Sequence, residues 1–125
     1  TLFPYTTLFR SAHSGSLTPE HFRQAGVPDA QIDALAIAGM ENFPVFRKTI
    51  LEGAAPVMDT DAVGAEIGAA AAAMTDGQPL DALLLECTDL SVFARTVQEA
   101  VSVPVYDINS LIAYAAFCVR RNQWV

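Results

Sequence analysis

The side chains best suited to chemistry lie together at residues 86–89, Glu-Cys-Thr-Asp, at the end of an apolar run in the stretch 81–90, DALLLECTDL. A run of this length indicates a buried strand, and a helical pattern starts at Ser91. The pattern therefore predicts Cys87 at the carboxyl end of a strand, against the amino end of a helix, where open α/β sheets commonly bind ligands. A thiolate there could serve as a nucleophile or as a general base.

Two opposite influences act on the Cys87 thiol. The positive end of a helix dipole and free backbone N–H groups lower the pKa of a thiol. The carboxylates of Glu86 and Asp89 flank the thiol and raise its pKa. The sequence leaves the net direction open, and it also leaves open a buried structural cysteine, which is common for this residue type.

Strand-like and helical patterns alternate along the chain and would position this thiol. Thr18 and Pro19 begin a short helix that Gly26 ends. The further elements expected, in order, are a strand at 32–39, helices at 43–52 and 61–75, the strand before Glu86, a helix at 91–102, a strand at 103–108 and a last helix capped by Asn109. This alternation predicts a three-layer α/β fold, with a parallel sheet of about four strands flanked by helices.

Two of the expected helices have a recognisable packing face. Gly64 and Gly68 leave a flat face on the alanine-rich helix 61–75, which predicts close packing on the sheet or on a neighbouring helix. In the helix 91–102, helical spacing places Val92, Phe93, Thr96, Val97 and Ala100 on one side.

The carboxyl ends of parallel strands meet at one edge of a sheet, which would bring several polar loops together. The residues expected at this edge are His13, Ser14, Ser16, Met40, Glu41, Asn42, Cys87, Thr88, Asp89, Asp107 and Asn109. Within this set we expect His13 to be a solvated loop residue and favour Asp107 as a helix cap. We expect His21 at the surface and Cys118 as a core or interlobe packing residue. The sequence has no Gly-rich phosphate fingerprint and no HExxH or CxxC spacing, which disfavours a nucleotide or zinc enzyme.

Composition narrows the class of protein. The chain has 125 residues, 52% of them hydrophobic, so it forms one domain at most and can build a core. Its net charge of −7, with seven basic residues, argues against nucleic acid as a partner. No apolar run is long enough for a membrane span, and the two cysteines occupy different settings, which fits a reducing compartment. We therefore expect a cytoplasmic protein, and the oligomeric state stays open, a homo-oligomer included.

The first eleven residues, TLFPYTTLFRS, match the conceptual translation of a common sequencing-adapter oligonucleotide residue for residue. Such segments are set aside before a fold is inferred. We therefore predict that residues 1–11 are adapter-derived, that the genuine chain starts near Ala12, and that the first strand of the fold is truncated.

The stretch ALLLECTDL, followed by a helix and VPVYDI, resembles the second-half signature of the aspartate/glutamate/hydantoin racemase superfamily. One branch of that superfamily carries ECTNL or ECTDL followed by PPYA, with a P-V-x-D strand further on. SLTPEHFRQAG and AGMENF also look like the upstream part of that branch. The resemblance implies that residues 12–108 form the second α/β lobe of a two-lobe protein, and that the helix within 109–125 packs on a first lobe absent from this chain.

The resemblance implies a mechanism without a cofactor or a metal. In that family two cysteines face each other across a small-molecule substrate, an amino acid or a related carboxylate; one takes the α-proton and the other donates one. Cys87 would be the second-lobe cysteine, and Thr88, Ser14 and Ser16 would bind the substrate. Because the first lobe is absent, we expect no racemase activity from these 125 residues alone.

Two alternatives remain beside this interpretation. A decarboxylase of the arylmalonate type, in the same superfamily, needs one such cysteine to protonate one face of its intermediate. A non-catalytic flavodoxin-like binding domain would share the strand and helix pattern. Residues 91–93 read Ser-Val-Phe where the racemase branch has Pro-Pro-Tyr, so the loop after Cys87 departs from the family pattern.

Overall fold

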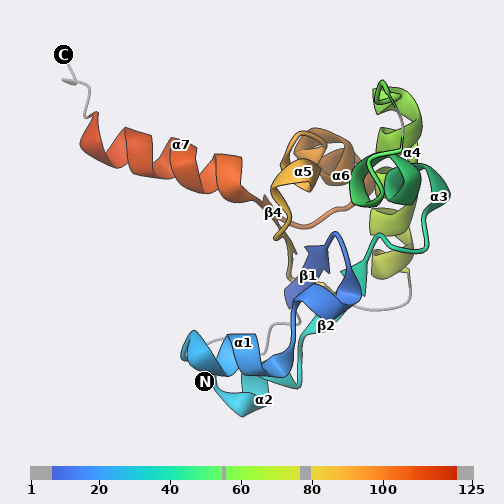
Figure 1. Ribbon diagram of the computed structural model, residues 1–125. Coiled ribbons are helices and arrows are strands. Elements are labelled where there is room, and N and C mark those ends of the chain that lie inside the picture. The colour runs from blue at the N-terminus through green and yellow to red at the C-terminus, as the bar shows by residue number, and fades with distance from the viewer. Residues whose placement is uncertain (1–6, 55, 77–79, 121–125) are drawn as a thin grey trace.

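A computed structural model describes residues 7–54, 56–76 and 80–120, with the main chain alone for residues 7–10. The strands are β1 Thr7–Ser11, β2 Ala36–Gly39, β3 Ala82–Leu85 and β4 Val105–Tyr106. The helices are α1 Pro19–Gln24, α2 Asp29–Ile32, α3 Pro44–Phe46, α4 Thr60–Thr75, α5 Thr88–Ser91, α6 Ala94–Ala100 and α7 Ile108–Val119 (Figure 1). A 3₁₀ turn, η1, spans Ser14–Ser16, and a π-helical turn, η2, spans Arg47–Leu51.

The strands pair in the order β2-β1-β3-β4, and every pair is parallel. β1 pairs with both β2 and β3, so that Phe9 lies opposite Ile37 on one side and Leu84 on the other. The predicted mixed α/β fold with a parallel sheet is therefore confirmed. Because all strands run in the same direction, their carboxyl ends share one edge, where Cys87 lies.

A strand is present at the position where a truncated first strand was expected. Residues 7–11, within the segment that matches a translated adapter, form β1, one of the two inner strands. The physical reason is that strand pairing uses main-chain N–H and C=O groups, which residues 7–11 provide because they contain no proline, and that Thr and Phe favour extended backbone. Residues 1–6 lie outside the described part of the chain, and the origin of residues 1–11 stays a prediction.

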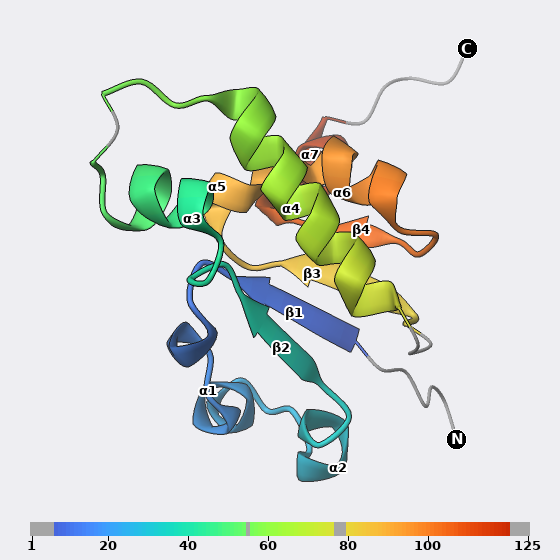
Figure 2. The same cartoon turned by 90° about the vertical axis from the view of Figure 1, so that its right-hand side faces the viewer.

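The main core lies between the sheet and the helices α4 and α6, which pack side by side (Figure 2). Leu83 and Leu85 alternate with Leu84 along β3 and are buried in this core, whereas Leu84 is only partly buried. On α4, a Cβ atom built on Gly64 would lie 3.4 Å from the Phe93 ring. The expected close packing along the glycine face of this helix is confirmed.

The expected bounds of one strand and of one helix need correction. Ile32 belongs to α2 rather than to the following strand, because Pro28 provides the N-cap of a single helical turn, and β2 begins only at Ala36. The single helix expected at 91–102 is two helices, α5 and α6, which meet at Val92 and Phe93. The break turns Phe93 into the core and leaves Val92 70% exposed, so Val92 does not share the buried face.

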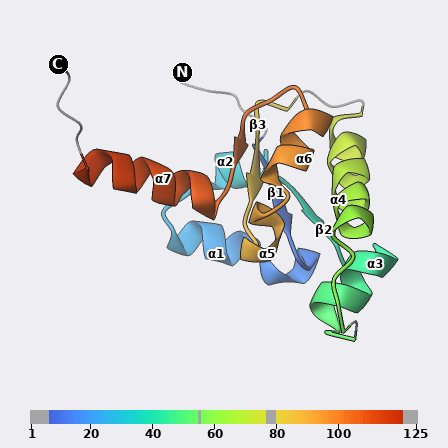
Figure 3. The same ribbon diagram turned by 90° about the horizontal axis from the view of Figure 1, so that it is seen from above.

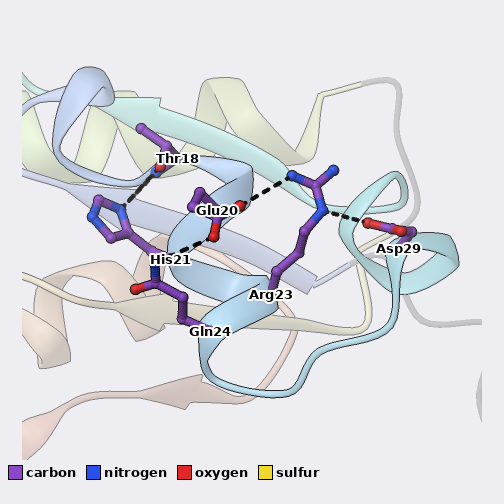
Figure 4. A network of polar contacts seen from close by, with 6 residues as sticks. All are labelled: Thr18, Glu20, His21, Arg23, Gln24 and Asp29. Atoms are coloured by element: carbon purple, nitrogen blue, oxygen red, sulfur yellow. Dashed lines mark hydrogen bonds and ion pairs between the residues drawn. The ribbon is translucent and has the colours of Figure 1, made fainter.

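On the other side of the sheet from α4 and α6 lie α1 and α2 (Figure 3). Thr18 and His21 form a capping box at the start of α1, and Arg23 bonds to Asp29 of α2 at 2.7 Å (Figure 4). Gly26 follows α1 with a φ of 84°, a left-handed conformation that suits glycine, as its position after a helix predicts. His21 is exposed, as expected.

The last helix, α7, extends away from the body of the molecule (Figure 1). Its cap is Asp107, not Asn109: Asp107 Oδ1 accepts a hydrogen bond from the Ser110 N–H at 2.6 Å, and Ser110 Oγ accepts one from the Asp107 N–H. Asp107 rather than Asn109 is the cap because the backbone at Asp107 is still extended, as an N-cap requires. Cys118 is exposed on α7, so its assignment to a core is wrong, and packing of α7 on a first lobe stays a prediction.

Candidate functional site

Cys87 is the N-cap of α5 and directly follows Glu86 at the end of β3. Its φ and ψ of −73° and 129° are extended, so the chain is still strand-like at the cysteine and becomes helical at Thr88. The position predicted for the thiol, between a strand end and a helix start, is therefore confirmed. The side chain is half-buried, and Sγ donates to Asp89 Oδ2 at 3.9 Å.

The environment raises the pKa of the Cys87 thiol above its ordinary value. Burial is the largest cause, because it disfavours the charged thiolate. The N–H groups of Asp89 and Leu90 act in the opposite direction, and the carboxylates of Asp89 and Glu86 reinforce the rise. The net direction that the sequence left open is therefore upward, which favours the protonated thiol over the thiolate.

Thr88 is the first residue of α5 and is exposed, beside the thiol and open to solvent. Four residues after Cys87, Ser91 lies at the end of α5 with 5% of its surface exposed, and its hydroxyl has no hydrogen-bond partner. A buried hydroxyl without a partner is unfavourable. This feature belongs to the loop where the sequence departs from the racemase pattern.

Ser14 lies at the same edge of the sheet, but it bonds to the loop after β2. Its hydroxyl donates to Glu41 Oε1 at 2.5 Å and its N–H donates to Glu41 Oε2 at 3.2 Å. These bonds, the hydroxyl first, lower the pKa of Glu41. Gly39 allows the approach, since a Cβ there would collide with the Glu41 carboxylate and the Ser14 main chain. Ser14 is thus engaged with a carboxylate.

The rest of this loop is held by local bonds. His13 is exposed, as expected, and its Nδ1 accepts a hydrogen bond from the Gly15 N–H at 3.0 Å. The Ser16 N–H donates to the His13 carbonyl at 2.9 Å, which closes η1. Ser16 is exposed, and η1, to which it belongs, contacts β1 and β2.

Two hydrogen bonds connect the carboxyl ends of neighbouring strands. Ser11, the last residue of β1, is buried and donates from Oγ to Glu86 Oε2 at 3.0 Å, next to Cys87. The Met40 N–H donates to the Ala12 carbonyl at 3.1 Å, which joins the ends of β1 and β2. Ser11 was not among the predicted site residues, because it lies in the segment that was set aside. The sequence did contain a signal for Ser11, because it is a polar residue at the end of a strand.

A groove that the sequence did not predict lies beside the thiol, between the ends of β3 and β4 and the start of α7. Its volume is about 630 Å³, and its lining residues are Leu84, Leu85, Glu86, Tyr106, Asp107, Ile108, Ser110, Leu111 and Tyr114. Cys87 does not line this groove, although Glu86 does. A smaller hollow of about 370 Å³ lies at the other end of the edge, against His13, Glu41 and Asn42. The edge therefore offers two hollows, with Cys87 outside both.

Among the described residues, no helix is both long and apolar enough to cross a membrane. Within the same residues, no three histidine, cysteine, aspartate or glutamate side chains are grouped to hold a metal ion. Comparison of the chain with protein-family models, with curated proteins and with solved structures gives no match. The resemblance to the racemase superfamily rests on the residues of the motif alone.

Proposed function

We propose that this chain is the second α/β lobe of a cofactor-independent racemase or epimerase of amino acids, of the aspartate/glutamate/hydantoin type, with Cys87 as its acid–base group. The observation that supports this most is the thiol at the N-cap of α5, on the carboxyl edge of a parallel sheet. The residues ECTDL around this thiol have the same order as in the branch of the family that they resemble. In the complete lobe we expect three layers around a sheet of about four strands.

The protonation state of Cys87 favours one half of the proposed reaction. A thiol whose pKa is raised holds its proton at neutral pH and can donate it to a carbanionic α-carbon. The bond from Sγ to hydrogen breaks, a bond from the α-carbon to hydrogen forms, and Sγ is left as a thiolate. Removal of the α-proton from the opposite face would then fall to a cysteine of the first lobe.

The groups that could bind the substrate lie on both sides of the thiol. The exposed Thr88 hydroxyl, at the start of α5, can donate to a carboxylate, and the backbone N–H groups there favour negative charge. Ser14 and Ser16 are proposed to contact the substrate from the η1 loop. Ser14 must then exchange its bond to Glu41 for a bond to the substrate, or hold Glu41 in place toward an amino group.

A second candidate function is single-thiol chemistry of the arylmalonate decarboxylase type. The raised pKa of Cys87 favours it, because protonation of one face needs a proton donor and no base on the opposite side. A non-catalytic binding domain is the third reading, and in that case Cys87 has no role beyond packing.

The decisive experiment is α-proton exchange in heavy water, with a protein in which a first lobe carrying its own strand-end cysteine precedes residue 7, so that β1 is kept. Aspartate, glutamate and substituted hydantoins are the substrates, and arylmalonates test the second candidate. We expect exchange with inversion, reduced by about a hundredfold or more in Cys87→Ser and unchanged in Cys118→Ser. Exchange that survives Cys87→Ser would refute the role of this thiol.

The 125-residue chain itself provides the complementary test. With one strand-end thiol it should not invert any of these substrates. A rate of racemisation above the uncatalysed background would contradict the two-lobe interpretation. Release of carbon dioxide from an arylmalonate that depends on Cys87 would instead establish the single-thiol alternative.

A further inference from the structure

The groove between β3, β4 and α7 combines apolar walls with negative charge. Its volume is about 630 Å³, and Leu84 and Leu111 are among its apolar lining residues. Two carboxylates, those of Glu86 and Asp107, also line it, and none of its lining residues is basic. The groove therefore suits a small ligand that is apolar over most of its surface and carries a positive charge.

Asp107 brings a buried carboxylate to this groove. It is only 8% exposed, and its Oδ1 accepts a hydrogen bond from the Ser110 N–H at 2.6 Å. Among the described residues, none donates to Oδ2 and none forms an ion pair with this carboxylate. The amino end of α7 stabilises part of the negative charge. A buried carboxylate without a cationic partner is costly, so a cation in the groove would be favoured.

Glu86 brings a second carboxylate to the same groove. Glu86 follows β3 and Asp107 follows β4, and these two strands are paired neighbours in the sheet. Glu86 Oε2 accepts a hydrogen bond from Ser11 Oγ at 3.0 Å, whereas no residue of the described chain donates to Oε1. One oxygen of each carboxylate is thus left for a ligand that donates hydrogen bonds.

Two aromatic side chains favour the same kind of ligand. Tyr106 is 53% exposed and Tyr114, on α7, is 67% exposed, and both line the groove. The face of a tyrosine ring attracts a cation, and it also packs well on an apolar or aromatic group.

We propose that this groove binds a small organic cation, a primary ammonium joined to an apolar body of about the size of a phenyl ring. The ammonium group lies between Glu86 and Asp107, to which it donates hydrogen bonds. The apolar body lies against Leu84, Leu111 and the two tyrosines. Every residue of this site belongs to the described chain, so binding needs no further lobe, and it does not depend on the chemistry proposed for Cys87.

The test is a titration of the 125-residue chain with phenethylamine, a cation at neutral pH, followed through the amide resonances in two-dimensional NMR spectra. We expect saturable shifts at residues 84–86 and 106–114. Ethylamine keeps the ammonium but lacks the ring, so it should bind at least about tenfold more weakly. Hydrocinnamate keeps the ring but reverses the charge, so the two carboxylates should repel it and no saturable shift should follow.

The double variant Glu86→Gln, Asp107→Asn removes both charges, while it keeps an acceptor for Ser11 and a good N-cap residue for α7. We expect it to raise the dissociation constant of phenethylamine by about tenfold or more. The matched control is Asp33→Asn, Glu99→Gln, which removes two charges at exposed positions outside the groove. It should leave the dissociation constant unchanged.

The amide resonances of α4, which contributes no residue to the groove, show whether each variant keeps the fold. The absence of saturable shifts at the groove would overturn the proposal. Equal binding of hydrocinnamate, or an unchanged affinity in the double variant, would overturn it too, because the groove would then select apolar bodies without regard to charge. Saturation that maps instead to the hollow at His13 and Glu41 would place the cation elsewhere. If the double variant does not fold, the three ligands compared on the unchanged chain still decide.

Discussion

Among single residues, Cys87 shows how a local environment sets the charge of a catalytic candidate. Two backbone N–H groups at the start of α5 favour the thiolate, yet burial and the neighbouring carboxylates outweigh them. Alkylation requires the thiolate, so the rate at Cys87 should be slow at neutral pH and rise as the pH approaches the raised pKa. Exposed Cys118 should be labelled faster.

Replacing Asp89 by asparagine tests the contribution of one carboxylate. The change removes a negative charge close to Sγ, so the pKa of Cys87 should fall and its alkylation at neutral pH should become about two- to fivefold faster, the size expected at a solvent-screened site. The measurement is the labelling rate against pH in a Cys118→Ser background. Asp33→Asn, at an exposed distant position, should have no effect. An unchanged pH profile in Asp89→Asn would show that the Asp89 carboxylate does not contribute to the raised pKa of Cys87.

The environment of Ser91 leads to a second prediction about a single residue. Its hydroxyl is buried and unpaired, so Ser91→Ala should increase the free energy of unfolding by about 1 kcal/mol. Denaturant unfolding measures the change, and exposed Ser102→Ala should alter it little. A loss of stability in Ser91→Ala would mean that the hydroxyl does have a partner.

At the scale of elements, the sequence predicted the kind of each element better than its limits. The alanine-rich helix was expected at 61–75 and spans Thr60–Thr75, because its propensity and its cap agree. The helix expected at 91–102 is broken, because Phe93 packs into the core. Val92 and Phe93 therefore lie between α5 and α6 and belong to neither helix. Such a break depends on where α4 lies, which local sequence does not encode.

The short helix α3 illustrates an element held by another element. Both oxygens of the Glu66 carboxylate, on α4, accept main-chain hydrogen bonds at the start of α3, from the N–H of Val45 at 3.0 Å and of Phe46 at 2.8 Å. Phe46 is fully buried, so these bonds position a core side chain. No local pattern predicts a cap that comes from twenty residues further along the chain.

Glu66→Ala should therefore destabilise the fold by about 1.5–3 kcal/mol, because it removes a charged acceptor from two backbone donors. Glu66→Gln keeps one acceptor and should cost less. The control is Glu99→Ala, which breaks only the exposed ion pair with Arg95 and should change stability by less than about 1 kcal/mol. Equal effects of Glu66→Ala and Glu99→Ala in denaturant unfolding would contradict the proposed cap.

For the whole molecule, the candidate site divides into a part that sequence reveals and a part that it does not. The place of Cys87 follows from an apolar run and a helix start that are contiguous in the chain. The bond from Ser11 to Glu86 joins residues 75 positions apart, and the groove beside α7 arises where β3, β4 and α7 meet. Both depend on the order of strands in the sheet, which the pattern of elements leaves open.

That order makes β1 the element on which the whole sheet depends. It separates β2 from β3, so its loss would leave β2 without its only partner in the sheet formed by the described strands. A chain that begins at Ala12 should therefore fail to form the cooperative core, whereas a chain that begins at Thr7 keeps every paired residue of β1. Thermal unfolding followed by near-ultraviolet circular dichroism distinguishes the two.

The same comparison tests whether the residues of β1 matter beyond their main chain. If residues 7–11 serve only as a strand, replacing 7–10 by valines and threonines while keeping Ser11 should preserve the core, because the pairing groups are unchanged. Ser11→Ala should cost about 1 kcal/mol more, since it removes the bond to Glu86 beside the thiol. A chain starting at Ala12 that unfolds as cooperatively as the full chain would show that β1 is dispensable, and that β2 and β3 then pair in another way.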